Sequence, residues 1–419
     1  MFIKIYNTLI TILYPLVIRG YVERRKQNGK EDVNRFNERV GRPKMKRPEG
    51  KLFWLHGASV GESVSMLPLI NKILETYPDS HVMVTTGTVT SADVMQKRLP
   101  ERAFHQFIPL DNPIFTTRFV KHWQPDVALW FESEFWPAVL SSIRRKNIPL
   151  ILINGRISNK TFKRWQQFDF VCKELLNCFN LCLGQSEEDA YRLRVLGAKE
   201  TACLGNLKYA GLPLPIDEAA KKELTKLIGK RKFWLASSTH DDEEIRIAKV
   251  HKRMKEKFPD LLTIIAPRHP NRGEAIAEEI NKIGLTTALR SKGEKLTPQT
   301  DIYIANTIGE MGLWYDLAKI VFIGGSLIPH GGQNFIEPSR MRDAVLVGPH
   351  MHNFTDAMNR AKKADAIMQV SDTAEMEELV TSLFENDSLL EAKASLAYNW
   401  ATSEAKVLDG IMDKIKAYF

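Results

Sequence analysis

Short apolar runs alternate with amphipathic stretches along most of the chain, and a turn follows each run. Such runs are typical of strands that are buried on both faces of a parallel sheet. Stretches with helical periodicity, such as 62–77 and 243–257, lie between them. The alternation predicts an α/β fold built on parallel sheets. The predicted strands are 52–55, 82–84, 127–131, 149–153, 181–183, 233–236, 261–265, 302–304, 320–323 and 344–347.

These strands fall into two sets of five, separated by a break near 205–230 that contains Gly211-Leu-Pro-Leu-Pro215. A chain of 419 residues is also too long for one ordinary core. We therefore expect two doubly wound, Rossmann-like domains that face each other across a cleft. The expected segments are an N-terminal helix at 1–22, a first domain at 23–206, a linker at 207–220 and a second domain at 221–419. The last helix of the chain belongs to the second domain or packs back on the first domain.

Polar residues gather directly after the predicted strands. In open α/β sheets, ligands bind beyond the carboxyl ends of the strands, so these residues predict a site between the two domains. A purely structural role is the alternative for each group; Ser59-x-x-Glu62, for example, matches a capping box at a helix start. The groups are His56–Glu62, Glu132–Pro137, Ser237–His240, Pro267–Pro270 and Asn306–Met311.

The stretch 324–338 carries the most specific signal. Four of its residues are glycines, which lets a backbone approach a ligand closely between a strand and a helix. A helix N-terminus favours anions, and Asn334 and Glu337 offer an amide and a carboxylate for hydroxyl groups. The combination suits a sugar nucleotide, with phosphate on backbone amides and ribose on the carboxylate. The alternative is that Asn334 and Glu337 simply cap the helix.

The predicted phosphate-binding residues lie in the second half of the chain, whereas Glu62 lies in the first. A helix start favours the ionised form of Glu62, which suits a general base. This division fits a glycosyltransferase, in which the base removes a proton from an acceptor hydroxyl as that oxygen attacks the anomeric carbon. Because no Asp-x-Asp stands at a strand end, we expect no obligatory metal and no other cofactor. The phosphate-binding candidates are Ser238, Arg268, His269 and the loop 324–332.

The net charge of +9 is concentrated at one end of the chain. Residues 1–50 contain 12 Lys and Arg and 5 Asp and Glu, a balance of +7, which leaves only +2 for the other 369 residues. A nucleic-acid-binding groove across the protein is therefore disfavoured. The four cysteines form no C-x-x-C pair and are predicted to be buried and reduced.

The basic N-terminal segment also contains an apolar run at 5–18. Fourteen helical residues reach about 21 Å, short of a hydrocarbon core of roughly 30 Å. One polar stripe (Lys4, Asn7, Thr8 and Thr11) and a following basic collar favour a helix that lies on or shallowly in an anionic membrane surface, with the rest of the chain in the cytoplasm. The alternative is a helix packed on the protein's own core.

Over essentially its full length, the chain resembles the 3-deoxy-D-manno-octulosonic acid (Kdo) transferases of lipopolysaccharide biosynthesis, which are inverting glycosyltransferases of the GT-B fold. The resemblance implies CMP-Kdo as donor, a lipid A precursor (lipid IVA) as acceptor, and a place on the cytoplasmic face of the cell inner membrane. The matching elements are the N-terminal anchor, Ser59-Val-Gly-Glu62, Glu132-Ser-Glu-Phe-Trp-Pro137, Leu204-Gly-Asn-Leu-Lys208, Ser238-Thr-His240, Pro267-Arg-His-Pro270, Gly309-Glu310, Gly324-Gly-Ser-Leu and Gly331-Gly-Gln-Asn-x-x-Glu337.

The resemblance also implies roles for individual residues. Glu62 is implied to be the general base, and Glu132 and Lys208 to stabilise the transition state. The residues implied to bind CMP are Arg268, His269, Gly309, Glu310, Met311, Asn334, Phe335, Ile336 and Glu337. Further contacts to the donor or its phosphate are expected from Ser238, His240, Gly325 and Gly332.

Three positions depart from the usual family pattern. Met311 stands where Leu is common, Asp241-Asp242 replaces a glycine-containing turn, and Asn271-Arg-Gly273 stands where an acidic residue and an aromatic are frequent. These changes put the geometry of the donor loops in question rather than the reaction. Two rival readings are another membrane-associated GT-B transferase that uses a UDP-sugar, and an inactive nucleotide-sugar-binding protein.

Overall fold

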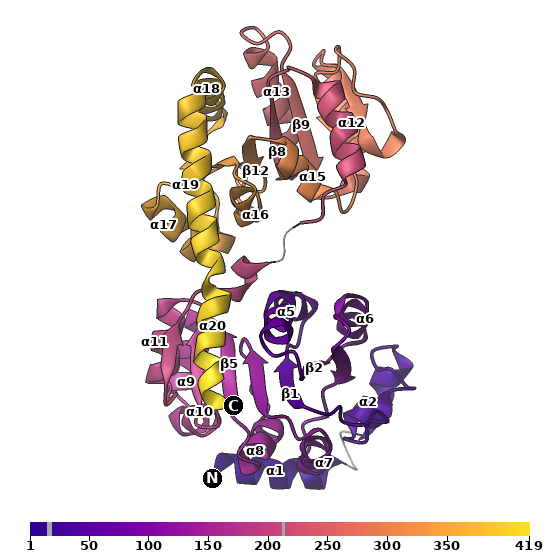
Figure 1. The fold of residues 1–419 in the computed structure, drawn as a ribbon, viewed down its shortest axis with the longest axis vertical. Coiled ribbons are helices and arrows are strands. Elements are labelled where there is room, and N and C mark those ends of the chain that lie inside the picture. Colours follow the sequence, from indigo (N-terminus) through magenta and orange to yellow (C-terminus); the bar gives the residue numbers. More distant parts are fainter. Residues whose placement is uncertain (15–18, 212–213) are drawn as a thin grey trace. The chain divides into compact units, whose positions relative to one another are not determined.

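The computed structural model describes residues 1–14, 19–211 and 214–419, and the chain forms two compact units (Figure 1). Unit 1 consists of Met1–Leu212 together with Glu404–Phe419, and unit 2 consists of Pro213–Ser403. The apolar run predicted at 5–18 and the linker predicted at 207–220 lie partly outside the described residues, at 15–18 and at 212–213.

Unit 1 is built on one seven-stranded, fully parallel sheet with the order β3-β2-β1-β4-β5-β6-β7. Successive side chains of a strand point to opposite faces, so Leu52 and Trp54 join one hydrophobic core while Phe53 and Leu55 join another. Both faces are thus covered, as the apolar runs predicted. The strands are β1 (Lys51–His56), β2 (Ser80–Thr86), β3 (Ala103–Phe107), β4 (Val127–Phe131), β5 (Leu150–Gly155), β6 (Leu181–Gly184) and β7 (Thr201–Cys203).

The helices of unit 1 cover its sheet, and the C-terminal α20 packs against α5. They are α1 (Phe2–Leu13), α2 (Arg19–Gln27), α3 (Phe36–Arg39), α4 (Val60–Ser65), α5 (Leu67–Thr76), α6 (Val89–Arg98), α7 (Pro113–Trp123), α8 (Pro137–Arg145), α9 (Asn159–Gln166), α10 (Asp169–Leu176), α11 (Glu187–Val195), the 3-10 helix η2 (Leu207–Ala210) and α20 (Val407–Ile415). The helix predicted at 62–77 is two helices, because Pro68 lacks the amide hydrogen that an uninterrupted helix needs.

Unit 2 also has a seven-stranded parallel sheet, with the order β10-β11-β9-β8-β12-β13-β14. Its strands are β8 (Phe233–Thr239), β9 (Leu262–Pro267), β10 (Thr287–Leu289), β11 (Ile302–Ile304), β12 (Ile320–Ile323), β13 (Ala344–Val347) and β14 (Met368–Gln369). Its helices are α12 (Glu218–Ile228), α13 (Glu243–Met254), α14 (Gly273–Lys282), α15 (Met311–Leu317), α16 (Ile336–Arg340), α17 (Thr355–Lys363) and α18 (Thr373–Glu385), and α19 (Asp387–Ala405) begins in this unit.

The predicted α/β class with two doubly wound, Rossmann-like domains is confirmed. All ten predicted strands are present, and the prediction missed β3, β7, β10 and β14. These four are the edge strands of the two sheets. An edge strand has one neighbour and is less buried, so its sequence need not be an apolar run.

Helix α1 lies along α7 and α8 and also contacts α10 (Figure 1). The Glu174 carboxylate accepts hydrogen bonds from the terminal amino group of Met1 at 2.7 Å and from the Phe2 amide at 2.7 Å, and Ile3 is buried. One face of this helix is therefore packed on the protein, as the alternative interpretation held. Its other face leaves an apolar stripe between 42% and 60% exposed: Ile5, Leu9, Ile12 and Leu13. Of the helices that the structure describes, none is long and apolar enough to cross a membrane.

Candidate functional site

In unit 1, the candidate base Glu62 lies in the first turn of α4, just beyond the carboxyl end of β1. The side-chain oxygen of Ser59 accepts the Glu62 amide at 3.2 Å and donates to the Glu62 carboxylate at 2.7 Å. The Ala58 amide donates to the other carboxylate oxygen at 2.8 Å. Glu62 thus has the capping geometry that the sequence offered as the structural alternative. Two donors do not saturate a carboxylate, which has about four lone-pair sites.

A cavity of about 530 Å³ lies beside Glu62, and Ala58 is one of its walls. Several other walls follow the carboxyl ends of the neighbouring strands, as expected for a ligand site in such a sheet. The lining combines two guanidinium groups, a partly buried carboxylate and aromatic rings. These residues include Tyr6, Arg25, Arg39, Asp111, Phe135 and Trp136.

Glu132 and Lys208 are brought together as an ion pair, with Lys208 Nζ 2.6 Å from Glu132 Oε1. Glu132 follows β4 directly and adopts the left-handed conformation, with φ of 56°. Lys208 is positioned by η2, whose first amide, that of Leu207, donates to the Asn154 side chain at 2.9 Å. The Lys208 side chain is 42% exposed, so its charge is accessible to a ligand.

In unit 2, three histidines gather beyond the ends of β8, β9 and β12. The ring of His240 lies 3.9 Å from that of His330 and 5.9 Å from that of His269, measured between centroids. Burial, His330, His269 and Arg268 together lower the pKa of His240 to about 4, so its ring is neutral at pH 7. Arg268 and His269 themselves are exposed. This cluster is suited to an anionic group.

The backbone amides of the glycine-rich loop at 324–332 differ from the prediction in what they bind. The carboxylate of Glu243, which is fully buried, accepts the amides of Gly325 at 2.6 Å, Ser326 at 3.1 Å and Leu327 at 3.0 Å. It also accepts the His240 amide at 2.9 Å. The prediction that these loop amides hold phosphate is therefore corrected: an internal carboxylate occupies them.

The remaining glycines have steric roles. Gly324 must be glycine because a Cβ there would stand 2.5 Å from the backbone oxygen of Ser238. At Gly332, where φ is 76°, a Cβ would stand 2.1 Å from the sulfur of Met351. The glycines thus allow close approach, but between segments of the protein. Ser238 is partly exposed and left-handed, with φ of 56°.

Glu310 lies at the start of α15, next to Gly309 and Met311, and is held by Arg290. Two guanidinium nitrogens of Arg290 lie 2.7 and 3.2 Å from the carboxylate. This pairing lowers the pKa of Glu310, so the group is ionised at pH 7. The neighbouring Ile308 is 89% exposed, which is unusual for an apolar side chain within a candidate site.

The segment 334–337 divides into polar and core residues. Asn334 Oδ1 accepts the amide of Ile336, the first residue of α16, at 3.1 Å, so Asn334 has a structural role at the helix start, although Phe335 is the N-cap residue. Phe335 is fully buried and stacks on Trp400 at 5.4 Å, and Ile336 is 2% exposed. The side chains of Phe335 and Ile336 therefore belong to the core, and only their backbone groups remain for a donor. Burial, offset by its hydrogen bond with Asn334, raises the pKa of Glu337.

Two departures from the family pattern contact each other. Asp242 has φ of 73°, a conformation that glycine adopts without strain, which accounts for the glycine common in this turn. Arg272 lies 2.7 Å from Asp241 and 2.8 Å from Glu244. The substituted turn after β8 is thus tied to the substituted turn after β9.

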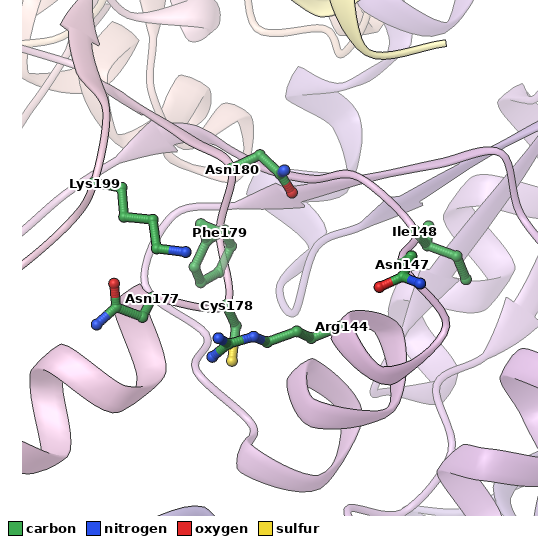
Figure 2. A pocket seen from close by; sticks show the side chains of 8 residues that line it. All are labelled: Arg144, Asn147, Ile148, Asn177, Cys178, Phe179, Asn180 and Lys199. Atoms are coloured by element: carbon green, nitrogen blue, oxygen red, sulfur yellow. The ribbon is translucent and has the colours of Figure 1, made fainter.

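Another hollow, of about 190 Å³, is shown in Figure 2. It lies near the amino ends of β5 and β6 and is therefore at the opposite end of the strands from Glu62. Arg144 and Lys199 line it together with the thiol of Cys178 and three asparagines (Figure 2). None of the predicted site residues lines this hollow.

Sequence reasoning missed three residues that the structure places in the site of unit 2. Glu243 is the first residue of the helical stretch predicted at 243–257, and that pattern gives it no role in a site. Arg290 follows β10, an edge strand that the pattern did not reveal. His330 lies within the glycine-rich stretch, so its position in a candidate motif was a usable signal.

Comparison with known proteins agrees with these features. Residues 34–211 match the family described as 3-Deoxy-D-manno-octulosonic-acid transferase (kdotransferase). The chain is 35% identical to the 3-deoxy-D-manno-octulosonic acid transferase of Rickettsia felis, over 88% of this chain and 79% of that protein. It is 36% identical to a probable mitochondrial 3-deoxy-D-manno-octulosonic acid transferase of Arabidopsis thaliana, over 93% of this chain and 89% of that protein.

Among solved structures, the fold is similar to that of a UDP-GlcNAc 2-epimerase from Neisseria meningitidis, with a TM-score of 0.56, 14% identity, and coverage of 87% of this chain and 100% of that chain. At this identity the likeness concerns the fold alone. The sequence identity with the transferases over most of the chain is what assigns the family: the protein belongs to the Kdo transferases and is a glycosyltransferase of the GT-B fold.

Proposed function

We propose that the protein transfers Kdo from CMP-Kdo to a lipid A precursor such as lipid IVA, with inversion at the anomeric carbon. The observation that carries the proposal is the position of Glu62. Its carboxylate is held at the carboxyl end of β1, keeps acceptor capacity, and lies beside a cavity with cationic and aromatic walls. The names of the relatives, which are Kdo transferases, support Kdo as the transferred sugar.

On the acceptor side, Glu62 removes the proton from an acceptor hydroxyl as its oxygen attacks the anomeric carbon. The new carbon–oxygen bond forms while the bond between the anomeric carbon and the CMP phosphate oxygen breaks, and the phosphate leaves with the electron pair. A single displacement of this kind inverts the anomeric centre. Lys208, oriented by Glu132, supplies positive charge to the developing anion.

On the donor side, Arg268 and His269 are proposed to bind the phosphate, with His240 and His330 beside them. Glu337 and the backbone around Asn334 are proposed to bind the ribose. Gly309, Glu310 and Met311 are proposed to contact the nucleotide. We expect no metal or other cofactor to be required, because Arg268 supplies positive charge and the histidines supply hydrogen-bonding groups to the leaving phosphate.

We also propose that the protein acts on the cytoplasmic face of the inner membrane, with the stripe of α1 in the interface. Phe170 extends this apolar surface, because it is 61% exposed and lies one turn before Glu174 on the same face of α10. Glu174 in turn binds the start of α1. Basic residues of α9, among them Lys163 and Arg164, suit anionic lipid headgroups.

The test is mass spectrometry of the product formed by purified full-length protein from CMP-Kdo and a tetra-acylated lipid A precursor. The expected result is a mass increase of one or more Kdo residues. Thermal unfolding separates the rival readings: CMP is expected to raise the unfolding temperature and UDP is not. Protection by UDP alone would favour a UDP-sugar transferase, and protection by CMP without any product would favour an inactive binding protein.

A further inference from the structure

We infer that the cavity beside Glu62 binds the phosphorylated sugar headgroup of the acceptor, and that helix α1 forms one of its walls. The helix proposed to lie in the membrane interface would then also be part of the acceptor site. This inference rests on the proposed function and names the place and the chemistry by which that function recognises its acceptor.

The cavity is positioned for the reaction. Ala58 lines it, and the amide of the same residue donates to the Glu62 carboxylate at 2.8 Å. A headgroup in the cavity would therefore contact the residue whose amide binds the carboxylate proposed to remove the proton. The volume of about 530 Å³ falls within the range of roughly 300–1,000 Å³ that is usual for small-molecule sites.

The lining suits a phosphorylated sugar. Arg25 and Arg39 both pair with the carboxylate of Glu31, and the buried Arg39 also donates to the Ile108 carbonyl, so Arg39 fixes this wall. Arg25, whose side chain is partly exposed, offers a guanidinium group, the kind of group that recognises phosphate through paired hydrogen bonds. Phe135 and Trp136 offer aromatic surface to the apolar face of a sugar or to the first part of an acyl chain. Cationic and aromatic walls together match an anionic glycolipid.

Helix α1 is fixed to this cavity through Tyr6. Tyr6 lines the cavity together with Asp111, whose carboxylate accepts the amides of Val139 at 2.9 Å and Ala138 at 3.3 Å at the start of α8. The apolar stripe of α1 borders this contact, since Leu9 stands three residues after Tyr6, and Ile5 is 51% and Leu9 is 52% exposed. One helix thus carries a cavity wall and, next to it, an exposed apolar stripe.

The first experiment fills the cavity. Gly87 lines it, and a Cβ added there would meet no atom within 4 Å, so Gly87→Trp introduces a large side chain at the cavity wall without a clash at its Cβ. The matched control is Gln96→Trp, which adds the same ring to an exposed position of the adjacent α6. With acceptor dispersed in detergent micelles, Gly87→Trp is expected to lower kcat/KM for the acceptor at least tenfold and to leave the KM for CMP-Kdo unchanged. An unaltered acceptor kcat/KM would overturn the inference.

The second experiment tests the wall. Tyr6→Ala is expected to raise the acceptor KM several-fold in detergent micelles, in which membrane binding by the enzyme plays no part. Tyr6→Phe keeps the aromatic ring and is expected to have a KM close to that of the unmodified protein. Thermal unfolding of each variant shows whether folding is affected. If Tyr6→Ala acts only on vesicles and not in micelles, α1 is an anchor and not a wall. If unmodified protein forms no product at all, the proposed function fails instead.

Discussion

Each unit of the molecule has a glutamate in the first turn of the helix that follows its first strand, and the two carboxylates are held differently. Glu62 in unit 1 is 9% exposed and accepts one backbone amide and one hydroxyl. Glu243 in unit 2 is fully buried and accepts four backbone amides. A glutamate at the equivalent position of the two sheets is therefore left partly unbonded in unit 1 and fully bonded to backbone amides in unit 2.

The difference lies in how much hydrogen-bonding capacity remains. A carboxylate with about four lone-pair sites is saturated by four amides and has nothing left for a substrate. Glu243 ties the loop after β12 to the loop after β8 and so fixes His240 and the glycine-rich stretch. Glu62 retains capacity and lies beside a cavity. The comparison suggests that Glu243 positions the donor loops while Glu62 takes part in the reaction.

The substitution Glu62→Gln is expected to have the largest effect, a loss of transferase activity. Glutamine can still accept from Ala58 and donate to Ser59, so the cap is kept while the base is lost. We expect transfer to fall about 10²–10⁴-fold, the usual contribution of a general base, with little change in unfolding temperature or in CMP affinity. Initial rates with purified protein provide the measurement. Near-normal turnover in Glu62→Gln would mean that capping is the only role of this residue.

The substitution Glu243→Gln is expected to have the second largest effect, a loss of folding stability. The amide group of glutamine presents a donor to amides that need an acceptor, so buried N–H groups lose their partners. Each such loss costs roughly 1–3 kcal/mol, and we expect about 3 kcal/mol in total. Urea unfolding measures this loss, and hydrogen exchange of the Gly325–Leu327 amides localises it. A change in Glu243→Gln no larger than in Glu62→Gln would erase the distinction between the two residues.

The sequence predicted the two parallel sheets but not the different roles of Glu62 and Glu243. The central strands were visible because each is covered on both faces and so reads as an apolar run, whereas β14 has two residues and β3 is Ala-Phe-His-Gln-Phe. Helical periodicity predicted a helix that starts at residue 243, and Glu243 and Glu244 lie in the first turn of α13. That Glu243 turns inward depends on the amides of Gly325–Leu327, which are some eighty residues away. Local pattern does not contain such a contact.

A moderate effect is expected on donor affinity in unit 2. Arg268→Ala removes the exposed guanidinium proposed to bind phosphate, and Glu337→Gln removes the carboxylate proposed to bind ribose. Hydrogen bonds to charged groups contribute roughly 1.5–3 kcal/mol, so each variant is expected to weaken CMP binding at least tenfold. Calorimetric titration with CMP is the measurement. Glu62→Gln is the matched comparison in unit 1, and equal affinity in all three variants would place the nucleotide elsewhere.

The smallest expected effect concerns acid sensitivity and one histidine of unit 1. Burial and, to a smaller extent, the positive charge of Arg35, which donates to Nδ1 at 3.0 Å, lower the pKa of His105 to about 3. The His105 ring therefore stays neutral in the folded protein. The unfolded chain takes up a proton near pH 6.5 while the folded protein does not, so stability falls as pH falls below 6.5. One such group loses about 1.4 kcal/mol between pH 7.5 and 5.5. His105→Gln keeps an acceptor for Arg35 and a donor for Thr86 but does not titrate, so its urea midpoint is expected to fall less over this range. An equal fall in both proteins would mean that His105 is protonated in the folded state.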